Sequence, residues 1–349
     1  MPKGLPRYRT GHKELDDQIL ELLAAAGETK DRDLLFELVV SGIRMGREGV
    51  DRGDLKIANA ALKEMRYAFH VFGPYRDVRK LTMFGSARTT PDEPAYQCAR
   101  ELAAQMAARG WMIMTGAGPG VMTAGLEGAG ADMSFGINIV LPFESMPAEV
   151  IADDAKLINF RYFFTRKLTF IKESSGFVLL PGGFGTMDEA FELLTLMQTG
   201  RSYPAPVVLL DAPGSSYWQT WREFVETELL ANHLISPHDL DLVTITDSIG
   251  SALGTITGFY SVFHSMRVVG GRLVLRLERE IHDRELARLN REFSDIVVVG
   301  EIERTVASRV EVEDDDAVDR PRLVFRFDNA SYSRLHQLIR AINDTDNRQ

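Results

Sequence analysis

Residues 176–198, GFVLLPGGFGTMDEAFELLTLMQ, contain the pattern that decides the fold. A short apolar run at 176–180 leads through a cluster of glycines into residues 186–198, where apolar side chains recur at helical spacing. A continuous apolar run is typical of a strand buried on both faces, as in a parallel sheet covered by helices. The stretch therefore predicts a strand, a glycine loop and a helix of a doubly wound α/β fold.

The same alternation of apolar runs and helical patterns extends to both sides of this stretch. Further strands are expected at 81–84, 112–115, 135–141, 207–210 and 242–246. Helices are expected between them, for example at 95–109 and 160–173. Residues 79–262 are therefore predicted to form one Rossmann-like domain with a parallel sheet.

Two segments flank this predicted domain. Residues 1–78 form an N-terminal extension whose apolar spacing predicts helices between 11 and 71. Residues 263–349 are expected to form a small α+β module, with strands at 273–277, 296–299 and 323–327 and helices at 283–293 and 332–342. The acidic stretch 311–319 is expected to be a solvated loop, with a partner site as the alternative.

Charge and composition exclude several classes of protein. The 349 residues include 40 Lys plus Arg and 50 Asp plus Glu, and the net charge of −10 disfavours non-specific binding of nucleic acid. The single cysteine, Cys98, cannot form an intramolecular disulfide, and the histidines show no metal-ligand spacing. We expect no metal, no cofactor, no nucleic-acid partner and no membrane span, and hence a cytoplasmic location.

Two glycine-rich loops carry the chemical signal. Residues 181–186, PGGFGT, and residues 115–122, TGAGPGVM, each follow a predicted strand and lead into a helix. Glycine lets backbone approach a ligand closely, and a helix N-terminus offers unpaired N–H groups to a phosphate. No GxxxxGK[ST] motif occurs, and the GxGxxG fingerprint lacks its third glycine and its acidic partner. The sequence thus disfavours both a P-loop and a nicotinamide site.

Glu189 and the Arg166-Lys167 pair have two interpretations each. Thr186 and Glu189 fit an [ST]xxE capping box, but the core face of the helix is already supplied by other residues, which leaves Glu189 able to face a ligand. Arg166 and Lys167 fit an ordinary solvated basic pair. Because they immediately precede the strand that ends in 181–183, they also fit a phosphate or ribose contact.

The combination resembles the LONELY GUY (LOG) family, once labelled lysine-decarboxylase-like. The PGGxGTxxE motif at 181–189 and the aromatic-x-Arg-Lys element at 164–167 carry the likeness, together with the glycine loop ending in Met122 and the turn at 84–88. The resemblance covers about residues 79–262. Ala117 and Pro119 depart from the family's glycine run.

The resemblance implies hydrolysis of a nucleoside 5′-monophosphate, AMP or N6-modified AMP, to free base and ribose 5-phosphate. It implies Arg166 and Glu189 as the catalytic pair. The substrate contacts that it implies are Lys167, Gly182, Gly183, Phe184, Gly185, Thr186, Thr195, Gly118, Gly120, Ser86 and Glu149. It further implies a homodimer or higher homo-oligomer in which neighbouring subunits complete the pocket.

This chemistry suits the residues. Cleavage of an N-glycosidic bond builds positive charge on the sugar, which a carboxylate such as Glu189 stabilises while it orients or deprotonates water. The competing prediction is a non-catalytic nucleotide or molybdenum-cofactor carrier of the same fold. A pyridoxal-dependent decarboxylase is disfavoured, since no lysine is marked as a Schiff base.

Overall fold

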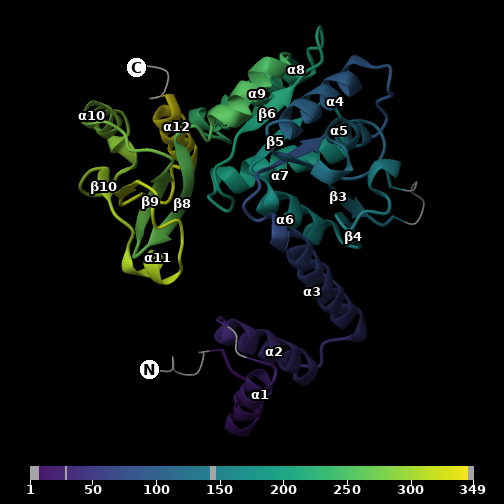
Figure 1. Ribbon diagram of the computed structural model, residues 1–349, viewed down its shortest axis with the longest axis vertical. Helices are drawn as coiled ribbons and strands as arrows, with labels where there is room; N and C mark the ends of the chain where they lie inside the picture. The colour runs from purple at the N-terminus through teal and green to yellow at the C-terminus, as the bar shows by residue number, and fades with distance from the viewer. Residues whose placement is uncertain (1–7, 28–29, 142–146, 345–349) are drawn as a thin grey trace. The chain divides into compact units, whose positions relative to one another are not determined.

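A seven-stranded parallel sheet organises the centre of the chain (Figure 1). The computed structural model describes residues 8–27, 30–141 and 147–344. The strands lie in the order β4-β3-β2-β1-β5-β6-β7, and each neighbouring pair is parallel. Their bounds are β1 (Lys80–Phe84), β2 (Met112–Thr115), β3 (Ser134–Ile139), β4 (Leu157–Phe160), β5 (Gly176–Leu179), β6 (Val207–Leu210) and β7 (Val243–Thr246).

The direction of strand addition reverses between β1 and β5. Strands β1 to β4 follow one another toward one edge of the sheet, and β5 to β7 follow one another toward the other edge. At such a switch point the two connecting loops diverge and leave a crevice at the carboxyl ends of the strands. The loops that follow β1 and β5 therefore frame the natural ligand position of this fold.

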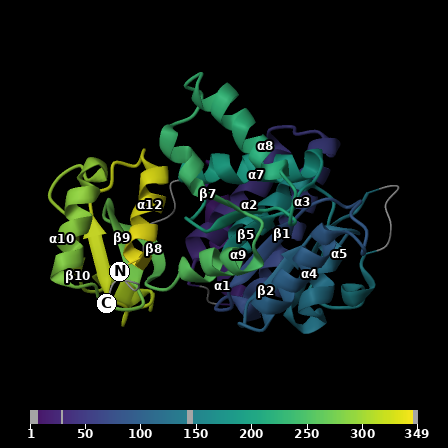
Figure 2. The same cartoon turned by 90° about the horizontal axis from the view of Figure 1, so that it is seen from above.

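Helices cover both faces of the sheet, as Figure 2 shows. One face packs against α6 (Phe163–Glu173), α7 (Phe184–Gln198) and α8 (Tyr217–Phe224). The other packs against α4 (Pro94–Ala107), α5 (Val121–Ala129) and α9 (Ile249–Gly258). Met112 and Met114 enter the first core while Ile113 enters the second, so the strand is apolar throughout. The sheet and its two helical layers confirm the predicted α/β class.

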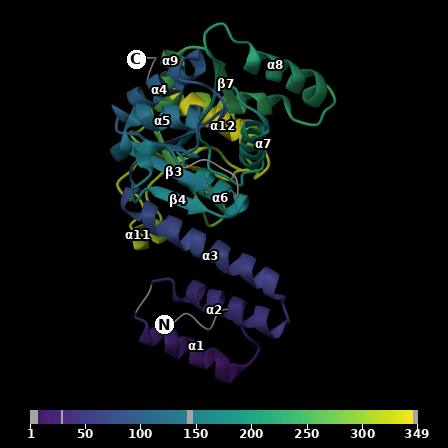
Figure 3. The ribbon, with the colours of Figure 1, turned by 90° about the vertical axis from the view of Figure 1, so that its right-hand side faces the viewer.

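The chain divides into two compact units, Met1–Arg66 and Tyr67–Gln349. In the first, α1 (Lys13–Ala25) and α2 (Arg32–Arg47) pack side by side around Ile19, Phe36 and Val40 (Figure 3). The third helix, α3 (Arg52–Phe72), contains the residues at which the two units divide, and its last turns belong to the second unit. Within that unit Phe72 stacks on Phe135 of β3 with 4.4 Å between ring centroids.

The second unit also contains the C-terminal module. Its four-stranded antiparallel sheet has the order β10-β11-β9-β8. The module comprises β8 (Phe263–Val269), β9 (Arg272–Leu277), α10 (Asp283–Glu292), β10 (Glu303–Thr305), α11 (Arg309–Glu313), β11 (Arg322–Phe325) and α12 (Tyr332–Asn343). The 3₁₀ helices of the second unit are η1 (Gly73–Tyr75), η2 (Ala131–Met133), η3 (Glu149–Ile151), η5 (Pro237–Leu242) and η6 (Ser294–Ile296), and η4 (Val225–Leu230) is a π-helix. Helix α12 contacts the Rossmann-like part, since Ser333 donates to Asp239 (2.6 Å).

Several local details differ from the predictions. The helix expected from residue 160 begins at Phe163, and Phe160 instead ends β4, a strand too short to show a period of its own. Residues 296–299 form only an isolated bridge between Val297 and Phe327, because η6 occupies the start of that run. Strand β8 was missed because its burial is only partial and its residues mix apolar and polar types.

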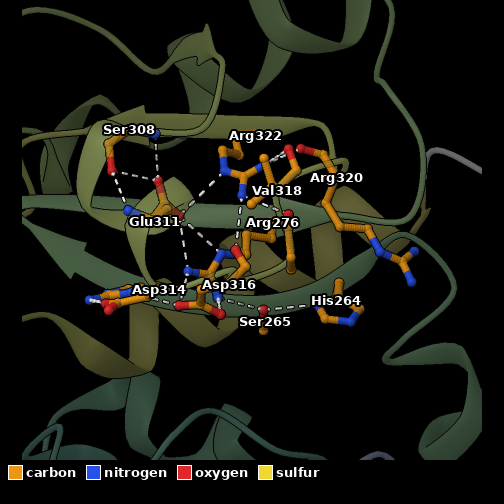
Figure 4. A network of polar contacts seen from close by, with 12 residues as sticks. His264, Ser265, Arg276, Ser308, Glu311, Asp314, Asp316, Val318, Arg320 and Arg322 are labelled. Atoms are coloured by element: carbon orange, nitrogen blue, oxygen red, sulfur yellow. Dashed lines mark hydrogen bonds and ion pairs between the residues drawn. The ribbon is translucent and has the colours of Figure 1, made fainter. Parts of the chain in front are cut away.

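The acidic stretch 311–319 begins in α11 and continues as a largely exposed loop between β10 and β11, as predicted, but some of its carboxylates form ion pairs within the fold. Glu311 is 1% exposed and accepts hydrogen bonds from Arg276 (2.9 Å) and Arg322 (3.3 Å), as Figure 4 shows. Asp316 accepts from Arg276 (2.6 Å) and from Arg267 (2.7 Å). Arg267 on β8 and Arg276 on β9 are distant in sequence from the acidic run, so the sequence does not show that they pair with it.

No helix in the part of the chain that the structure describes is long and apolar enough to cross a membrane.

Candidate active site

A cleft of about 770 Å³ lies at the switch point of the parallel sheet. Its walls come from the loops after β1 and β5 and from the first turns of α5, α6, α7 and α8. The lining residues are Phe84, Gly85, Ser86, Ala87, Arg88, Met122, Phe163, Arg166, residues 182–189 and Tyr217. Among the proposed site residues the cleft therefore brings together Arg166, Glu189, Ser86 and the loop 182–186.

Ser86 ties the loops of three strands together through its backbone. Its N–H donates to the carbonyl of Pro181 (3.1 Å), and its carbonyl accepts from the N–H of Val121 (3.1 Å). Gly120 has a φ of +70°, and a Cβ there would overlap the Ser86 carbonyl. A Cβ on Gly182 would overlap the Thr186 side chain. Glycine is therefore required for this close packing of backbone at the floor of the cleft.

The N-terminus of α7 opens into the cleft. Gly183 is its N-cap residue, and no side chain caps the helix. Thr186 lies within the first turn and is 5% exposed, so the capping box proposed for Thr186 and Glu189 is wrong. The helix begins at Phe184, three residues earlier than a capping box at Thr186 requires. The first amides of α7 have no intrahelical acceptor, and they form a ready anion site.

Glu189 lines the cleft one turn into α7. Burial raises the pKa of its carboxyl to about 7, and the positive charges of Lys167 and Arg166 offset only part of that effect. Glu189 thus exists in both protonation states near neutral pH. A carboxyl in that range is suited to take up or release a proton during a reaction.

Arg166 is held by a backbone carbonyl and by an aromatic ring. Its Nε donates to the carbonyl of Ile137 (2.9 Å), and its guanidinium carbon lies 5.4 Å from the centroid of the Phe170 ring. A Cβ on Gly116 would overlap the guanidinium and the Met122 sulfur. The first glycine loop therefore provides the space in which the Arg166 side chain lies.

Lys167 points elsewhere. Its Nζ forms ion pairs with Asp188 (2.7 Å) and Glu192 (2.8 Å), and so it joins α6 to α7. Burial opposes the charge, but the hydrogen bonds to the two carboxylates hold the pKa of Lys167 above its usual value. Lys167 is not among the residues that line the cleft.

Four other proposed contacts also lie outside the lining. Thr195 is two turns further along α7, where its hydroxyl donates to the Phe191 carbonyl (2.7 Å). Glu149 is exposed in η3. Gly118 packs against the Met122 side chain, and Gly120 packs against the Ser86 carbonyl. The resemblance to the family assigned these residues by sequence position alone, and side-chain direction cannot be read from position.

Several lining residues were not predicted as contacts. Tyr217 on α8 donates its hydroxyl hydrogen to the carbonyl of Gly182 and so braces the second glycine loop. Phe163 and Phe184 are 50% and 97% exposed, and they give the cleft an apolar rim. Arg88 adds a positive charge. The only available signal for Tyr217 was its place after β6, the neighbour of β5 in the sheet.

Within residues 8–27, 30–141 and 147–344, no group of three or more His, Cys, Asp or Glu is placed to hold a metal ion. Cys98 is buried in α4, and burial raises the pKa of its thiol, which makes it a poor nucleophile.

Comparisons with known proteins find related sequences. Residues 114–256 match a protein family described as possible lysine decarboxylase. The chain is 30% identical over 159 residues to a cytokinin riboside 5′-monophosphate phosphoribohydrolase of Mycobacterium tuberculosis, covering 45% of this chain and 82% of the relative. It is 32% identical over 123 residues to a probable enzyme of the same name from Oryza sativa subsp. japonica, covering 33% of this chain and 52% of that relative.

Among solved structures, the molybdenum cofactor binding protein of Rippkaea orientalis is similar, with 22% identity and a TM-score of 0.34. The alignment covers 50% of this chain and 92% of that one. The fold and cleft define an α/β protein of Rossmann-like topology with a candidate site at its switch point. Within that class, the chain belongs to the LONELY GUY family, because its likeness to the mycobacterial relative spans most of that protein.

Proposed function

We propose that this protein is a nucleoside 5′-monophosphate phosphoribohydrolase that releases free base and ribose 5-phosphate. One observation carries the proposal: a carboxyl whose pKa lies near 7 shares a single cleft with a positioned arginine and an open helix N-terminus. The names of the family relatives support the same reaction class.

The phosphate binds at the N-terminus of α7 and the loop 182–186. The free amides and the positive end of the helix dipole favour a dianion there. Because the phosphate does not react, its binding free energy serves to position the sugar. Arg88 and Arg166 line the same cleft. Their positive charges attract a phosphate there, although the chain as a whole has a net charge of −10.

Glu189 acts at the anomeric carbon. In its carboxylate form it accepts a proton from the attacking water as the C1′–O bond forms and the C1′–N bond breaks. The departing base takes up a proton from Glu189, which regenerates the carboxylate, so that the products are the free base and ribose 5-phosphate. The negative charge also stabilises the oxocarbenium character of the sugar. Arg166 holds the ribose or phosphate in the reactive orientation.

Phe163 and Phe184 supply apolar surface at the rim, where a planar base can stack. Phe163, Phe164 and Leu168 of α6 are each at least 46% exposed, and a second copy of the chain would cover them. We therefore propose that the protein forms a homodimer or a higher homo-oligomer in which the neighbouring subunit closes the pocket. The extensions 1–78 and 263–349 then serve assembly or regulation.

A substrate panel tests the proposal. Purified protein is incubated with AMP, GMP, CMP, UMP, IMP and N6-isopentenyl-AMP, and free base and ribose 5-phosphate are quantified. Release of base from at least one nucleotide is the expected result. Binding of nucleotides without any release would instead support a non-catalytic carrier.

A further inference from the structure

A second cavity, of about 520 Å³, lies at the amino ends of the strands of the parallel sheet, whereas the cleft lies at their carboxyl ends. One wall consists of segments that precede strands, including Arg79 before β1, Ser175 before β5 and Ala205 before β6. The other wall comes from β8 and β9 of the C-terminal module. Its volume lies within the range of small-molecule sites.

The cavity contains a positive charge that lacks a counter-ion. Arg79 is half-buried, and no carboxylate in residues 8–27, 30–141 and 147–344 forms an ion pair with it. Its guanidinium carbon lies 3.5 Å from the centroid of the Tyr260 ring. Burial raises the pKa of the Tyr260 phenol to about 12, and its hydroxyl donates to the Ser175 carbonyl (2.7 Å), so Tyr260 is neutral.

The other charges of the cavity do not neutralise Arg79. Arg267 and Arg276 line it, and Asp316 is the acidic residue among its lining residues. Asp316 is already shared between those two arginines, at 2.7 Å and 2.6 Å. Lys172 adds a further positive charge and pairs with Glu173. A half-buried arginine without a carboxylate pays a desolvation cost that a bound anion would offset.

The loop after α7 supplies an unused hydroxyl and a ring. Ser202 lines the cavity, and its Oγ is buried without a hydrogen-bond partner among the described residues. The neighbouring Tyr203 also lines it and is 73% exposed. An orphan donor beside an exposed aromatic ring fits a polar ligand that carries a flat group.

We propose that this cavity is a regulatory site for a phosphorylated small molecule with a planar ring, that is, a nucleotide. The phosphate pairs with Arg79 and accepts from Ser202, and the ring packs on Tyr203. This site is separate from the cleft, and the proposal goes beyond the phosphoribohydrolase function.

Helix α6 couples the two sites. Phe163 and Arg166 at its start line the cleft, while Ile171 and Lys172 at its end line the second cavity. Helix α7 likewise begins in the cleft and leads into the loop that contains Ser202. A ligand that prefers one position of these helices therefore changes the position of Arg166 and hence the turnover in the cleft.

Calorimetric titration of the full chain tests the site, with ATP, GTP, ADP and inorganic pyrophosphate as probes. We expect at least one nucleotide to bind at a site that Arg166→Ala leaves intact. Arg79→Ala should weaken that binding at least tenfold, and Tyr203→Ala should weaken it for nucleotides but not for pyrophosphate. Arg201→Ala removes a positive charge from the loop that contains Ser202 and Tyr203, but Arg201 does not line the cavity, so this control should change the affinity less than twofold.

Tyr203→Ala alters an exposed side chain and decides the question even if Arg79→Ala does not fold. The site is refuted if no probe binds, or if binding is lost in Arg166→Ala and unchanged in Arg79→Ala and Tyr203→Ala. The bound nucleotide should also change kcat/KM of the cleft reaction at least twofold, and an unchanged value refutes the regulatory role. Because binding is measured without turnover, a failure of the phosphoribohydrolase proposal is seen separately.

Discussion

At the scale of single residues, Glu189 combines a functional advantage with a cost in stability. The pKa of the folded carboxyl is about 7, above the ordinary value of 4.5, because burial disfavours its charge. The unfolded chain therefore releases this proton more readily than the folded one. Stability falls as pH rises from 4.5 through 7, and the whole loss is present above 7.

Substitution of Glu189 separates chemistry from structure. Glu189→Gln should lower kcat about 10²- to 10⁴-fold, because it removes the proton acceptor. The same change should raise the free energy of unfolding at pH 8 by about 1–3 kcal/mol, because an amide carries no charge to bury. Steady-state kinetics and urea unfolding measure the two effects. Lower stability with normal turnover would identify Glu189 as a structural residue.

Gly116 is predicted to matter through Arg166. A Cβ at this position would overlap the guanidinium, so Gly116→Ala should displace it and lower kcat/KM at least tenfold while the fold remains. Gly254→Ala is the matched control, since a Cβ there meets nothing within 4 Å and alanine favours the helix. Kinetics with circular dichroism distinguish the two variants. Equal activity of both would show that the position of Arg166 is unimportant.

At the scale of elements, α11 is anchored by a buried charge network. Ser308 caps the helix and pairs with Glu311, which also receives Arg276 and Arg322. Burial works against ionisation of Glu311, but the bonds from Ser308 and Arg276 lower its pKa to about 2. Because the folded pKa is depressed, the network stabilises the module above pH 4.5 and loses that effect as pH falls toward 2.

Breaking this network should loosen the C-terminal module. Glu311→Gln leaves buried arginines undercompensated and should cost about 3 kcal/mol. Glu313→Gln on the same helix removes an exposed pair with Arg309 and should cost no more than about 0.5 kcal/mol. Hydrogen exchange of β9 and β11 reports the loss. Equal protection in both variants would contradict the role of Glu311.

The elements differ in how well the sequence predicts them. Strands such as β5 and β6 are predicted well, because burial on both faces demands uninterrupted apolar runs. Strand β4 is not, because its four residues are too few to show a period. The network around Glu311 is not, because Arg276 is remote from it in sequence. In the site, Arg166 and the loop 182–186 line the cleft as expected, whereas Lys167 lies beside it in ion pairs. A basic pair shows which charges exist, but only packing shows where each one points.

At the scale of the molecule, His336 lies where α12 packs on the Rossmann-like part. It is 3% exposed, and its Nε2 lies 3.3 Å from the Ala205 carbonyl. Burial lowers its pKa to about 4 from an ordinary value of 6.5. The unfolded chain therefore binds a proton that the folded chain refuses, so acidification below 6.5 favours unfolding.

This predicts an acid-sensitive junction. Between pH 7.5 and pH 5 the wild-type protein should lose about 2 kcal/mol of stability through His336, which His336→Gln should not lose. Urea unfolding of both proteins at the two pH values gives the difference. Parallel pH dependence of wild type and variant would show that His336 does not contribute.

The measurement that tests the central claim most directly is the release of free base and ribose 5-phosphate from nucleoside 5′-monophosphates between pH 5 and pH 9. With Glu189 as the base, kcat/KM for an accepted nucleotide should rise about tenfold per pH unit at low pH and level off near 7. Absence of base release from all six nucleotides at every pH, with nucleotide binding retained, would contradict the assignment.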